Sequence, residues 1–273
     1  MNVISSERRT ARIVLLGCGA INSRVASLLR SRQSTATVVG VIVRHPGAVS
    51  REVAPGAVVM TDPADLAALA PDIVLEAASR EAVRQWGAVA LRAARRVVIS
   101  SASAFADDDL LRDLKDTARQ CGSRLVLSPG ALAGVEALSA GARLALREVR
   151  HRIIKSPKSW GAAAQAHATS PDPAAPVVLF EGSAREAAKR YPLNANVTVV
   201  SALASIGLDR TVVELVCDPA ITVNCHEIRA AGDFGSLMIR VENQPLPSNP
   251  KSSELAALAL VRLAENEVAD LVL

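Results

Sequence analysis

A glycine turn between an apolar run and an amphipathic segment constrains this chain more than any other feature. Residues 12–30, RIVLLGCGAINSRVASLLR, predict a buried strand, a turn at Gly17 and Gly19, and a helix that begins near Ala20 and Ile21. In dinucleotide-binding turns the first glycine permits the tight bend. The second lets the backbone approach a pyrophosphate at the positive end of the following helix. The stretch therefore predicts a cofactor-binding turn, and a generic strand-to-helix turn is the alternative.

One position departs from the usual pattern of such turns. The third position is normally Gly or Ala, so that helix and strand can pack closely. Here the position holds Asn22. We expect the larger side chain to push the helix outward and to weaken cofactor binding.

The end of the next apolar run indicates which cofactor binds. Residues 37–43, TVVGVIV, predict a second strand that ends at Arg44. An acidic residue at this point accepts hydrogen bonds from the ribose 2′-OH of NAD, whereas an arginine accommodates the 2′-phosphate of NADP. Arg44 therefore favours NADP over NAD, and a solvated loop arginine is the alternative.

Apolar runs alternate with helical segments through the first half of the chain. The predicted strands are residues 13–16, 37–43, 56–60, 72–75, 97–100 and 124–127. This alternation predicts an α/β fold with a doubly wound parallel sheet of the Rossmann type. Because the carboxyl ends of such strands line the ligand crevice, we expect Ala78, just after the run 72–75, to lie beside the cofactor.

From about residue 145 the pattern changes to β-like segments with polar alternation. These are residues 149–155, 177–180, 197–200, 211–217, 226–231 and 235–242, with helices predicted at 183–190 and 201–207. They predict a second α+β domain with a largely antiparallel sheet. We therefore assign residues 1–130 to a dinucleotide-binding domain and 131–250 to a substrate-binding and catalytic domain. A C-terminal helix within 251–273 is expected to pack back on the first domain.

Composition limits the classes of partner. Of the 273 residues 50% are hydrophobic and 2% are aromatic, which predicts a soluble globular protein with an aliphatic core. The net charge of +4 suits an anionic ligand, but the basic residues are spread along the chain, which argues against nucleic-acid binding.

The four cysteines show no metal-ligand spacing, so we expect reduced thiols and no metal site. Neither a membrane span nor a signal peptide is predicted, so a cytoplasmic location is expected.

The second half of the chain holds a candidate proton carrier. Hydride transfer to a nicotinamide needs cofactor placement, substrate orientation and a proton carrier from the protein. His226 lies in a polar run with Asn224 and Glu227, and imidazole carries protons near neutral pH. A histidine bonded within a strand is the alternative. The weaker candidates, in loop-like or strand-edge contexts, are His45, His151 and His167.

Amides and lysines supply candidate substrate contacts. Asn194 and Asn196 follow a predicted helix, and an amide offers both a donor and an acceptor to a carboxamide or an amino acid. Turn chemistry after Pro192 explains these asparagines equally well. Lys155 and Lys251 are candidate partners for a substrate carboxylate, with solvated surface lysines as the alternative.

Several stretches together resemble the L-aspartate dehydrogenase family. They are GCGAIN, LEAAS, SASAFADDDL, PGALAGVEALSA, KSPKSW, FEGSAREAAKRYPLNANV, ALASIGLDRTVVEL, DPAITVNCHEI, GDFGS and NPKSS. The resemblance runs from the glycine turn almost to the C-terminus. It implies a two-domain, usually dimeric enzyme that oxidises L-aspartate with NAD or NADP to iminoaspartate. That product hydrolyses to oxaloacetate and ammonia, or feeds NAD biosynthesis. The second domain would then also be the dimerisation domain.

The resemblance also implies roles for individual residues. Ala131, in PGA, and Asn196, the second asparagine of NAN, would contact the nicotinamide cofactor. His226, in NCH, would be the active-site residue, and Lys155 or Lys251 would hold the substrate carboxylates. Two alternatives stay open. One is an NAD(P)-dependent dehydrogenase of another small amino or hydroxy acid, and the other is a non-catalytic protein of the same fold that binds a dinucleotide or metabolite.

Overall fold

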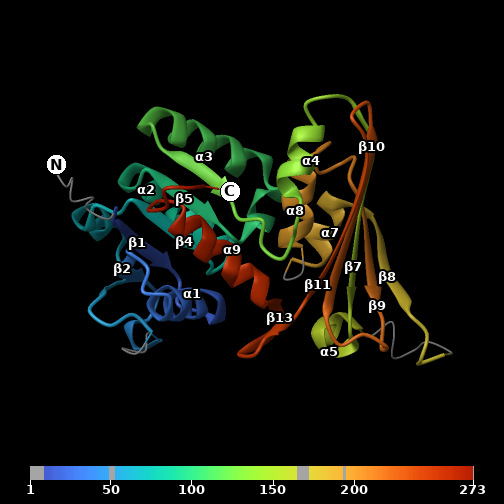
Figure 1. The fold of residues 1–273 in the computed structure, drawn as a ribbon, viewed down its shortest axis with the longest axis horizontal. Helices are drawn as coiled ribbons and strands as arrows, with labels where there is room; N and C mark the ends of the chain where they lie inside the picture. The colour runs from blue at the N-terminus through green and yellow to red at the C-terminus, as the bar shows by residue number, and fades with distance from the viewer. Residues whose placement is uncertain (1–8, 49–52, 165–171, 193–194, 273) are drawn as a thin grey trace, which may run out of the picture. The chain divides into compact units, whose positions relative to one another are not determined.

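The chain divides into two compact units (Figure 1). The computed structural model describes residues 9–48, 53–164, 172–192 and 195–272. The first unit consists of Met1–Ser101, Asp109–Val126 and Ala257–Leu273, and the second consists of Ala102–Asp108 and Leu127–Ala256. The short segment 102–108, which the sequence placed in the first domain, therefore belongs to the second unit.

The first unit is built on a six-stranded sheet with the order β3-β2-β1-β4-β5-β6. Its strands are β1 (Ala11–Leu16), β2 (Ala36–Ile42), β3 (Val58–Met60), β4 (Ile73–Glu76), β5 (Arg96–Ile99) and β6 (Arg124–Leu127). The pairs β1–β2, β1–β4, β2–β3 and β4–β5 are parallel. This is the strand order of the Rossmann fold, in which ligands bind where the order reverses, here between β1 and β4. The predicted doubly wound parallel sheet is confirmed.

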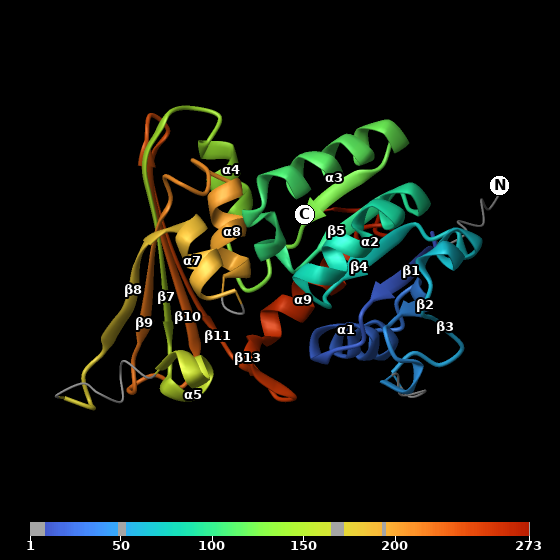
Figure 2. The same ribbon diagram turned by 180° about the vertical axis from the view of Figure 1, so that it is seen from behind.

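Helices cover both faces of this sheet (Figures 1 and 2). One face carries α1 (Ala20–Ser31) and the part of α9 (Glu254–Glu265) that belongs to this unit. The other face carries α2 (Arg80–Ala93), α3 (Asp108–Cys121) and the 3₁₀ helix η2 (Pro63–Leu69). A further 3₁₀ turn, η1 (Pro46–Ala48), follows β2.

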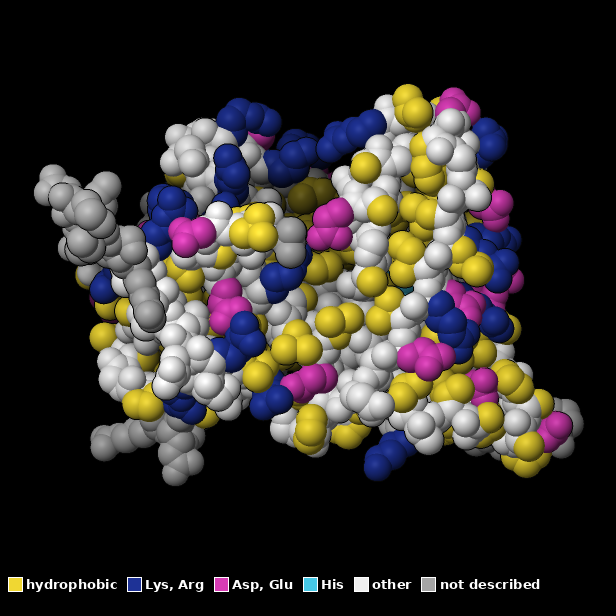
Figure 3. All heavy atoms as spheres, in the orientation of Figure 1, with side chains coloured by type: hydrophobic (Ala, Val, Ile, Leu, Met, Phe, Trp, Pro, Cys, Tyr) yellow, Lys and Arg dark blue, Asp and Glu magenta, His cyan; other side chains and the backbone are white. Residues whose placement is uncertain are grey.

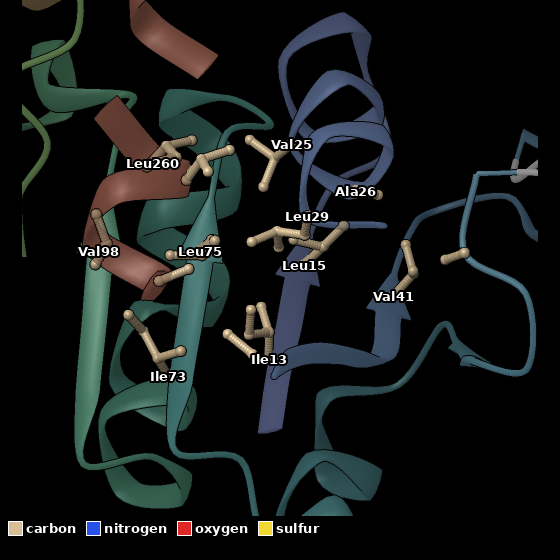
Figure 4. Packing of buried hydrophobic residues seen from close by; sticks show 14 of the residues in the cluster. Ile13, Leu15, Val25, Ala26, Leu29, Val41, Ile73, Leu75, Val98 and Leu260 are labelled. Carbon is tan, nitrogen blue, oxygen red and sulfur yellow. The ribbon is translucent and has the colours of Figure 1, made fainter. Parts of the chain in front are cut away.

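Aliphatic side chains from the strands and from two helices form the core of the first unit (Figure 4). The strands contribute Ile13, Leu15, Ile73, Leu75 and Val98, and the helices contribute Val25, Leu29 and Leu260. Each of these side chains is at most 3% exposed. Because burial of one such side chain contributes about 1.5–3 kcal/mol, the shared core fixes α1, which starts at the glycine turn, against the ends of the central strands.

The second unit contains a five-stranded sheet with the order β11-β10-β7-β9-β8. Its strands are β7 (Leu146–Lys155), β8 (Val177–Ser183), β9 (Val212–Cys217), β10 (Asn224–Gly232) and β11 (Gly235–Asn243). The pairs β7–β10, β10–β11 and β8–β9 are antiparallel, and β7–β9 is parallel. A short antiparallel pair, β12 (Pro245–Leu246) and β13 (Asn249–Ser253), follows. The predicted α+β unit with a largely antiparallel sheet is confirmed.

Helices pack on one face of the second sheet (Figures 1 and 2). They are α4 (Val135–Gly141), α7 (Ala184–Arg190) and α8 (Asn196–Leu203), with the 3₁₀ helix η3 (Ala102–Ala106) against α8. The short helix α5 (Pro157–Trp160) and the turn η4 (Gly161–Ala164) follow the end of β7. The side chains of β7 alternate between the two faces of the sheet. Val149, His151 and Ile153 are buried toward the helices, and Arg150 is exposed on the opposite face.

The prediction of a strand at 197–200 is wrong, and the helix predicted at 201–207 begins earlier, at Asn196, and ends at Leu203. Residues 196–203 form one helix, α8, in which Thr198, Val199 and Val200 are at most 3% exposed. Their β-branched side chains favour strands by only fractions of a kcal/mol. Burial against the sheet and the neighbouring helices outweighs that local preference.

Basic side chains are dispersed over the face of the molecule that Figure 3 shows. On the face drawn in Figure 3, Lys and Arg of the described residues lie in several separate groups with acidic side chains between them. Within the described part of the chain, no helix combines the length and the apolarity needed to cross a membrane.

Candidate active site

The glycine turn has a geometry that only glycine allows at its first position. Gly17 has φ +89°, and a Cβ built there would lie 2.5 Å from the Cβ of Ala78. Gly19 precedes α1, and a Cβ there would meet nothing within 4 Å, so its backbone borders open space. Helix α1 begins at Ala20 and has no acidic residue in its first turn. Its unpaired N–H groups and positive dipole end are therefore available to an anion.

Asn22 anchors the turn from inside. Its side chain is fully buried, and Nδ2 donates hydrogen bonds to the carbonyls of Leu16 (3.1 Å), Gly17 (2.9 Å) and Leu75 (3.3 Å). The amide thus ties the turn to the ends of β1 and β4, while α1 keeps its place in the core. From the sequence, Asn22 was expected to push the helix outward and to weaken cofactor binding, and the pattern gave no sign of these three hydrogen bonds.

A cavity of about 340 Å³ opens beside the turn. Its lining includes Gly17, Gly19, Ala78 and the residues after β2, Arg44 and His45. Arg44 is exposed, so its guanidinium is free to meet a ligand phosphate at this edge. The structure thus brings together four of the predicted cofactor-binding residues. The other two predicted here, Ala20 and Ile21, begin α1 and do not line the cavity.

A buried carboxylate shapes the loop that borders this cavity. Glu76 ends β4, and its Oε1 accepts hydrogen bonds from the N–H groups of Ala78 (2.8 Å) and Ser79 (3.1 Å). Its two oxygens also accept the hydroxyl (2.8 Å) and the N–H (2.9 Å) of Ser101. Burial raises the pKa of Glu76 above its ordinary value, and these hydrogen bonds act in the opposite direction. Sequence analysis did not select Glu76, although a carboxylate that ends a buried strand at the ligand edge was a usable signal.

Two histidines meet in the interior of the second unit. His226 of β10 is 3% exposed, and its Nδ1 lies 3.3 Å from Nε2 of His151 on β7. Nδ1 of His151 lies 2.8 Å from the hydroxyl of Ser201 on α8. Burial lowers the pKa of His151 to about 3. Burial, with smaller contributions from His151 and Lys155, also holds the pKa of His226 well below its ordinary value. Both imidazoles are therefore neutral at neutral pH.

The prediction that His151 occupies a strand-edge context is wrong. The residue lies within the central strand of the five-stranded sheet and is fully buried. The signal was present in the sequence, because Val149, His151 and Ile153 alternate with charged residues and so share the inner face of a strand.

Lys155 is a further buried polar side chain on this face of the sheet. It ends β7, is 6% exposed, and its Nζ lies 5.3 Å from the centre of the Trp160 ring. Burial lowers the pKa of Lys155 to about 8. Lys251, in contrast, is exposed on β13. Its Cε would lie 3.7 Å from a Cβ built on Gly161, the residue that follows Trp160.

The remaining predicted residues of the second unit serve local contacts. The carbonyl of Ala131 accepts a hydrogen bond from Nδ2 of Asn243 (3.0 Å). Asn196 begins α8, and its Oδ1 accepts a hydrogen bond from the N–H of Ser103 (3.0 Å), which leaves Nδ2 as a donor for a ligand. Asn194 and His167 lie outside the described residues.

The strand order of the first sheet and the glycine-turn cavity at its switch point place the chain in the class of dinucleotide-binding proteins with a Rossmann fold. Residues 17–128 match the family model for the NAD-binding domain of homoserine dehydrogenase. Residues 136–267 match the model for the C-terminal domain of aspartate dehydrogenase. The chain belongs to the aspartate dehydrogenase family.

Relatives cover almost the whole chain. The L-aspartate dehydrogenase of Brucella anthropi is 48% identical over 262 residues, which cover 96% of this chain and 98% of the relative. The L-aspartate dehydrogenase of Acinetobacter baumannii is 42% identical over 199 residues, which cover 72% of this chain and 76% of the relative.

Solved structures agree with this assignment. The aspartate dehydrogenase of Thermotoga maritima has a TM-score of 0.76 at 26% identity, with 97% of this chain and 100% of that one covered. A hyperthermophilic archaeal homoserine dehydrogenase in complex with NADPH has a TM-score of 0.61 at 11% identity and covers 95% of this chain and 98% of its own. The second likeness shows the fold alone.

Proposed function

We propose that this protein oxidises L-aspartate to iminoaspartate with NAD⁺ or NADP⁺, and that the imine then hydrolyses to oxaloacetate and ammonia or feeds NAD biosynthesis. The observation that carries the proposal is the placement of His226 and Lys155 on the same buried face of the second sheet. A neutral base and a buried cation are what oxidation of a dicarboxylic amino acid needs from the protein. The membership in the aspartate dehydrogenase family supports the choice of substrate.

Lys155 is proposed to bind a substrate carboxylate. Desolvation of a carboxylate is costly unless a charged donor replaces its water, and a buried ammonium makes a strong, charge-assisted hydrogen bond. Since burial already lowers the pKa of Lys155, a carboxylate would also restore the favourable charged state of the lysine. Lys251 and Asn194 are proposed as further substrate contacts.

The glycine turn fits the dinucleotide. Backbone N–H groups at the start of α1 are proposed to hold a pyrophosphate, and Arg44, which lines the adjacent cavity, is proposed to bind the 2′-phosphate of NADP. When bound, the nicotinamide supplies the acceptor for the hydride that leaves Cα of aspartate. The residues proposed to bind the cofactor are Gly17, Gly19, Ala20, Ile21, Arg44, Ala78, Ala131 and Asn196.

His226 is proposed to take a proton from the α-ammonium group of aspartate. Removal of that proton frees the nitrogen lone pair, which forms the C=N bond as the hydrogen on Cα departs with its electron pair. A neutral imidazole accepts the proton, so the low pKa of His226 keeps the base in its active form at neutral pH.

We further propose that the enzyme is a cytoplasmic homodimer. Its four cysteines are all free, as is usual in a reducing compartment. Members of the family it resembles are usually dimeric, and the strand register places the exposed Met238 and Val178 on the sheet face opposite the helices. Sedimentation of the purified protein tests the dimer, and a monomer at micromolar concentration would contradict it.

The direct test follows the near-ultraviolet absorbance of the reduced nicotinamide. Purified protein is mixed with L-aspartate and either NAD⁺ or NADP⁺, with L-glutamate, L-homoserine and L-malate as comparison substrates. We expect reduction to depend on aspartate and to be lost in His226→Ala without loss of nucleotide binding. Turnover of another acid but not of aspartate would favour a different dehydrogenase, and nucleotide binding without any turnover would favour a non-catalytic protein.

A further inference from the structure

We propose that His151 is a positioning residue, which holds His226 in the tautomer whose Nε2 carries a free lone pair. The inference deepens the proposed function and rests on it, because it assigns the atom of His226 that receives the substrate's proton. It is carried by a chain of hydrogen bonds in the second unit that runs from α8 through β7 to β10.

The hydroxyl of Ser201 determines which atom donates in each hydrogen bond of this series. Its Oγ lies 3.0 Å from the carbonyl oxygen of Thr198, to which it donates, and 2.8 Å from Nδ1 of His151. A carbonyl oxygen only accepts hydrogen bonds, and a serine hydroxyl has one hydrogen to donate. With that hydrogen directed to Thr198, Ser201 must accept from His151, so Nδ1 of His151 carries the hydrogen.

The tautomer of His151 determines the tautomer of His226. Neutral His151 with its hydrogen on Nδ1 has a bare Nε2, which therefore accepts from Nδ1–H of His226 across 3.3 Å. Neutral His226 then has no hydrogen left for Nε2. Among the described residues, His226 makes its side-chain hydrogen bond to His151 through Nδ1, so the lone pair on Nε2 is left for a substrate.

The reverse direction is less favourable. If Ser201 donated to His151, then His151 would donate from Nε2 to Nδ1 of His226, and His226 would carry its hydrogen on Nε2. That arrangement gives up the bond from Ser201 to the carbonyl of Thr198, a buried acceptor on α8. The first arrangement makes one more hydrogen bond with the same atoms, so it should dominate.

A second imidazole suits this substrate better than a carboxylate does. Catalytic histidines are commonly oriented by an aspartate or glutamate. Aspartate as a substrate carries two carboxylates, and a third negative charge behind the base would repel it. The charged and titratable groups acting on His226 are instead His151 and Lys155 of β7, and its partner on β11 is the apolar Val241. Ser201 of α8 acts on His226 through its contact with His151. Neutral His151 therefore orients the base without adding negative charge.

The tautomers can be measured without any substrate. Long-range ¹H–¹⁵N spectra of the histidine side chains in the purified protein distinguish a protonated ring nitrogen from a bare one. We expect Nδ1 protonated and Nε2 bare in both His151 and His226, and a change in both when Ser201→Ala removes the acceptor. A hydrogen on Nε2 of His226 in the unmodified protein would overturn the proposal, whatever the activity toward aspartate.

Kinetics then separate positioning from packing. His151→Phe keeps a ring in place but removes the acceptor for His226, and we expect kcat to fall about 100-fold with little change in KM for aspartate. His151→Gln restores an amide oxygen near the position of Nε2 and should recover most of kcat. Equal losses in both variants together with a lower Tm would indicate packing alone, and an unchanged kcat in His151→Phe would show no role. Either result overturns the proposal. If the unmodified protein does not turn over aspartate, the proposed function fails, while the spectra still decide the tautomer.

Discussion

Burial makes the charge of Lys155 depend on pH in the range near pH 8. Because desolvation lowers the pKa of Lys155 to about 8, the charged fraction of this lysine falls as the pH rises through that value. A dicarboxylate without an amino group, such as succinate, isolates this effect from the titration of the substrate's own amine. We expect its inhibition constant to be smallest below pH 8 and to increase above it.

Variants assign that pH dependence to one side chain. Lys155→Met should weaken succinate binding at least about 10-fold and flatten its pH profile. Lys158→Met is the matched control, because Lys158 lies on α5 close by but is exposed. Inhibition by succinate that is independent of pH in the unmodified protein would contradict the role given to Lys155.

Single residues also mark how far the sequence could predict the site. Gly17 and His226 are predicted from the sequence because a turn motif and a family resemblance point to them directly. The contact between His151 and His226 could not be predicted, because the two residues are distant in sequence and the pairing of β7 with β10 brings their rings together. The hydrogen bonds of Asn22 to backbone carbonyls could not be predicted either, because they depend on where β1 and β4 end.

At the scale of elements, the end of β2 is proposed to decide which nucleotide binds. Arg44 follows this strand and lines the cavity beside the glycine turn. Arg44→Asp replaces a partner for the 2′-phosphate with an acceptor for the 2′-OH, so affinity for NADP⁺ should fall at least about 10-fold relative to NAD⁺. Calorimetric titration with both nucleotides measures the change. Arg92→Asp, which makes the same charge change at an exposed position on α2, is the control. Equal losses for both nucleotides in Arg44→Asp would argue against the assignment.

Helices and strands could be predicted from the sequence where the local residue pattern favours the same secondary structure that burial stabilises. The central strands β1 and β4 are largely apolar runs, as expected for parallel strands buried on both faces, and their positions follow the prediction closely. Helix α8 was missed because its β-branched residues favour a strand when considered alone. Its helical state is decided by packing between segments that are far apart in the sequence, which a local pattern does not contain.

At the scale of the whole molecule, the two units divide the tasks of one reaction. We propose that the first unit binds the nucleotide through the glycine turn and Arg44, and that the second binds an amino acid with two carboxylates through His226 and Lys155. Sequence analysis predicted this division from the change of pattern near residue 145 and from the resemblance. The strand orders, and with them the neighbours of each candidate residue, required the structure.

Transfer of deuterium from the substrate tests directly whether the nicotinamide is reduced by a hydride from Cα of L-aspartate. The protein is supplied with L-aspartate deuterated at Cα and with the oxidised nucleotide that it binds more tightly, and the reduced nucleotide is then examined by NMR. If the protein oxidises L-aspartate by hydride transfer, we expect deuterium to appear on the nicotinamide ring and turnover to be slower than with unlabelled aspartate. Reduced nucleotide that carries no deuterium, or no reduction at all by a protein that still binds the nucleotide, would contradict this mechanism.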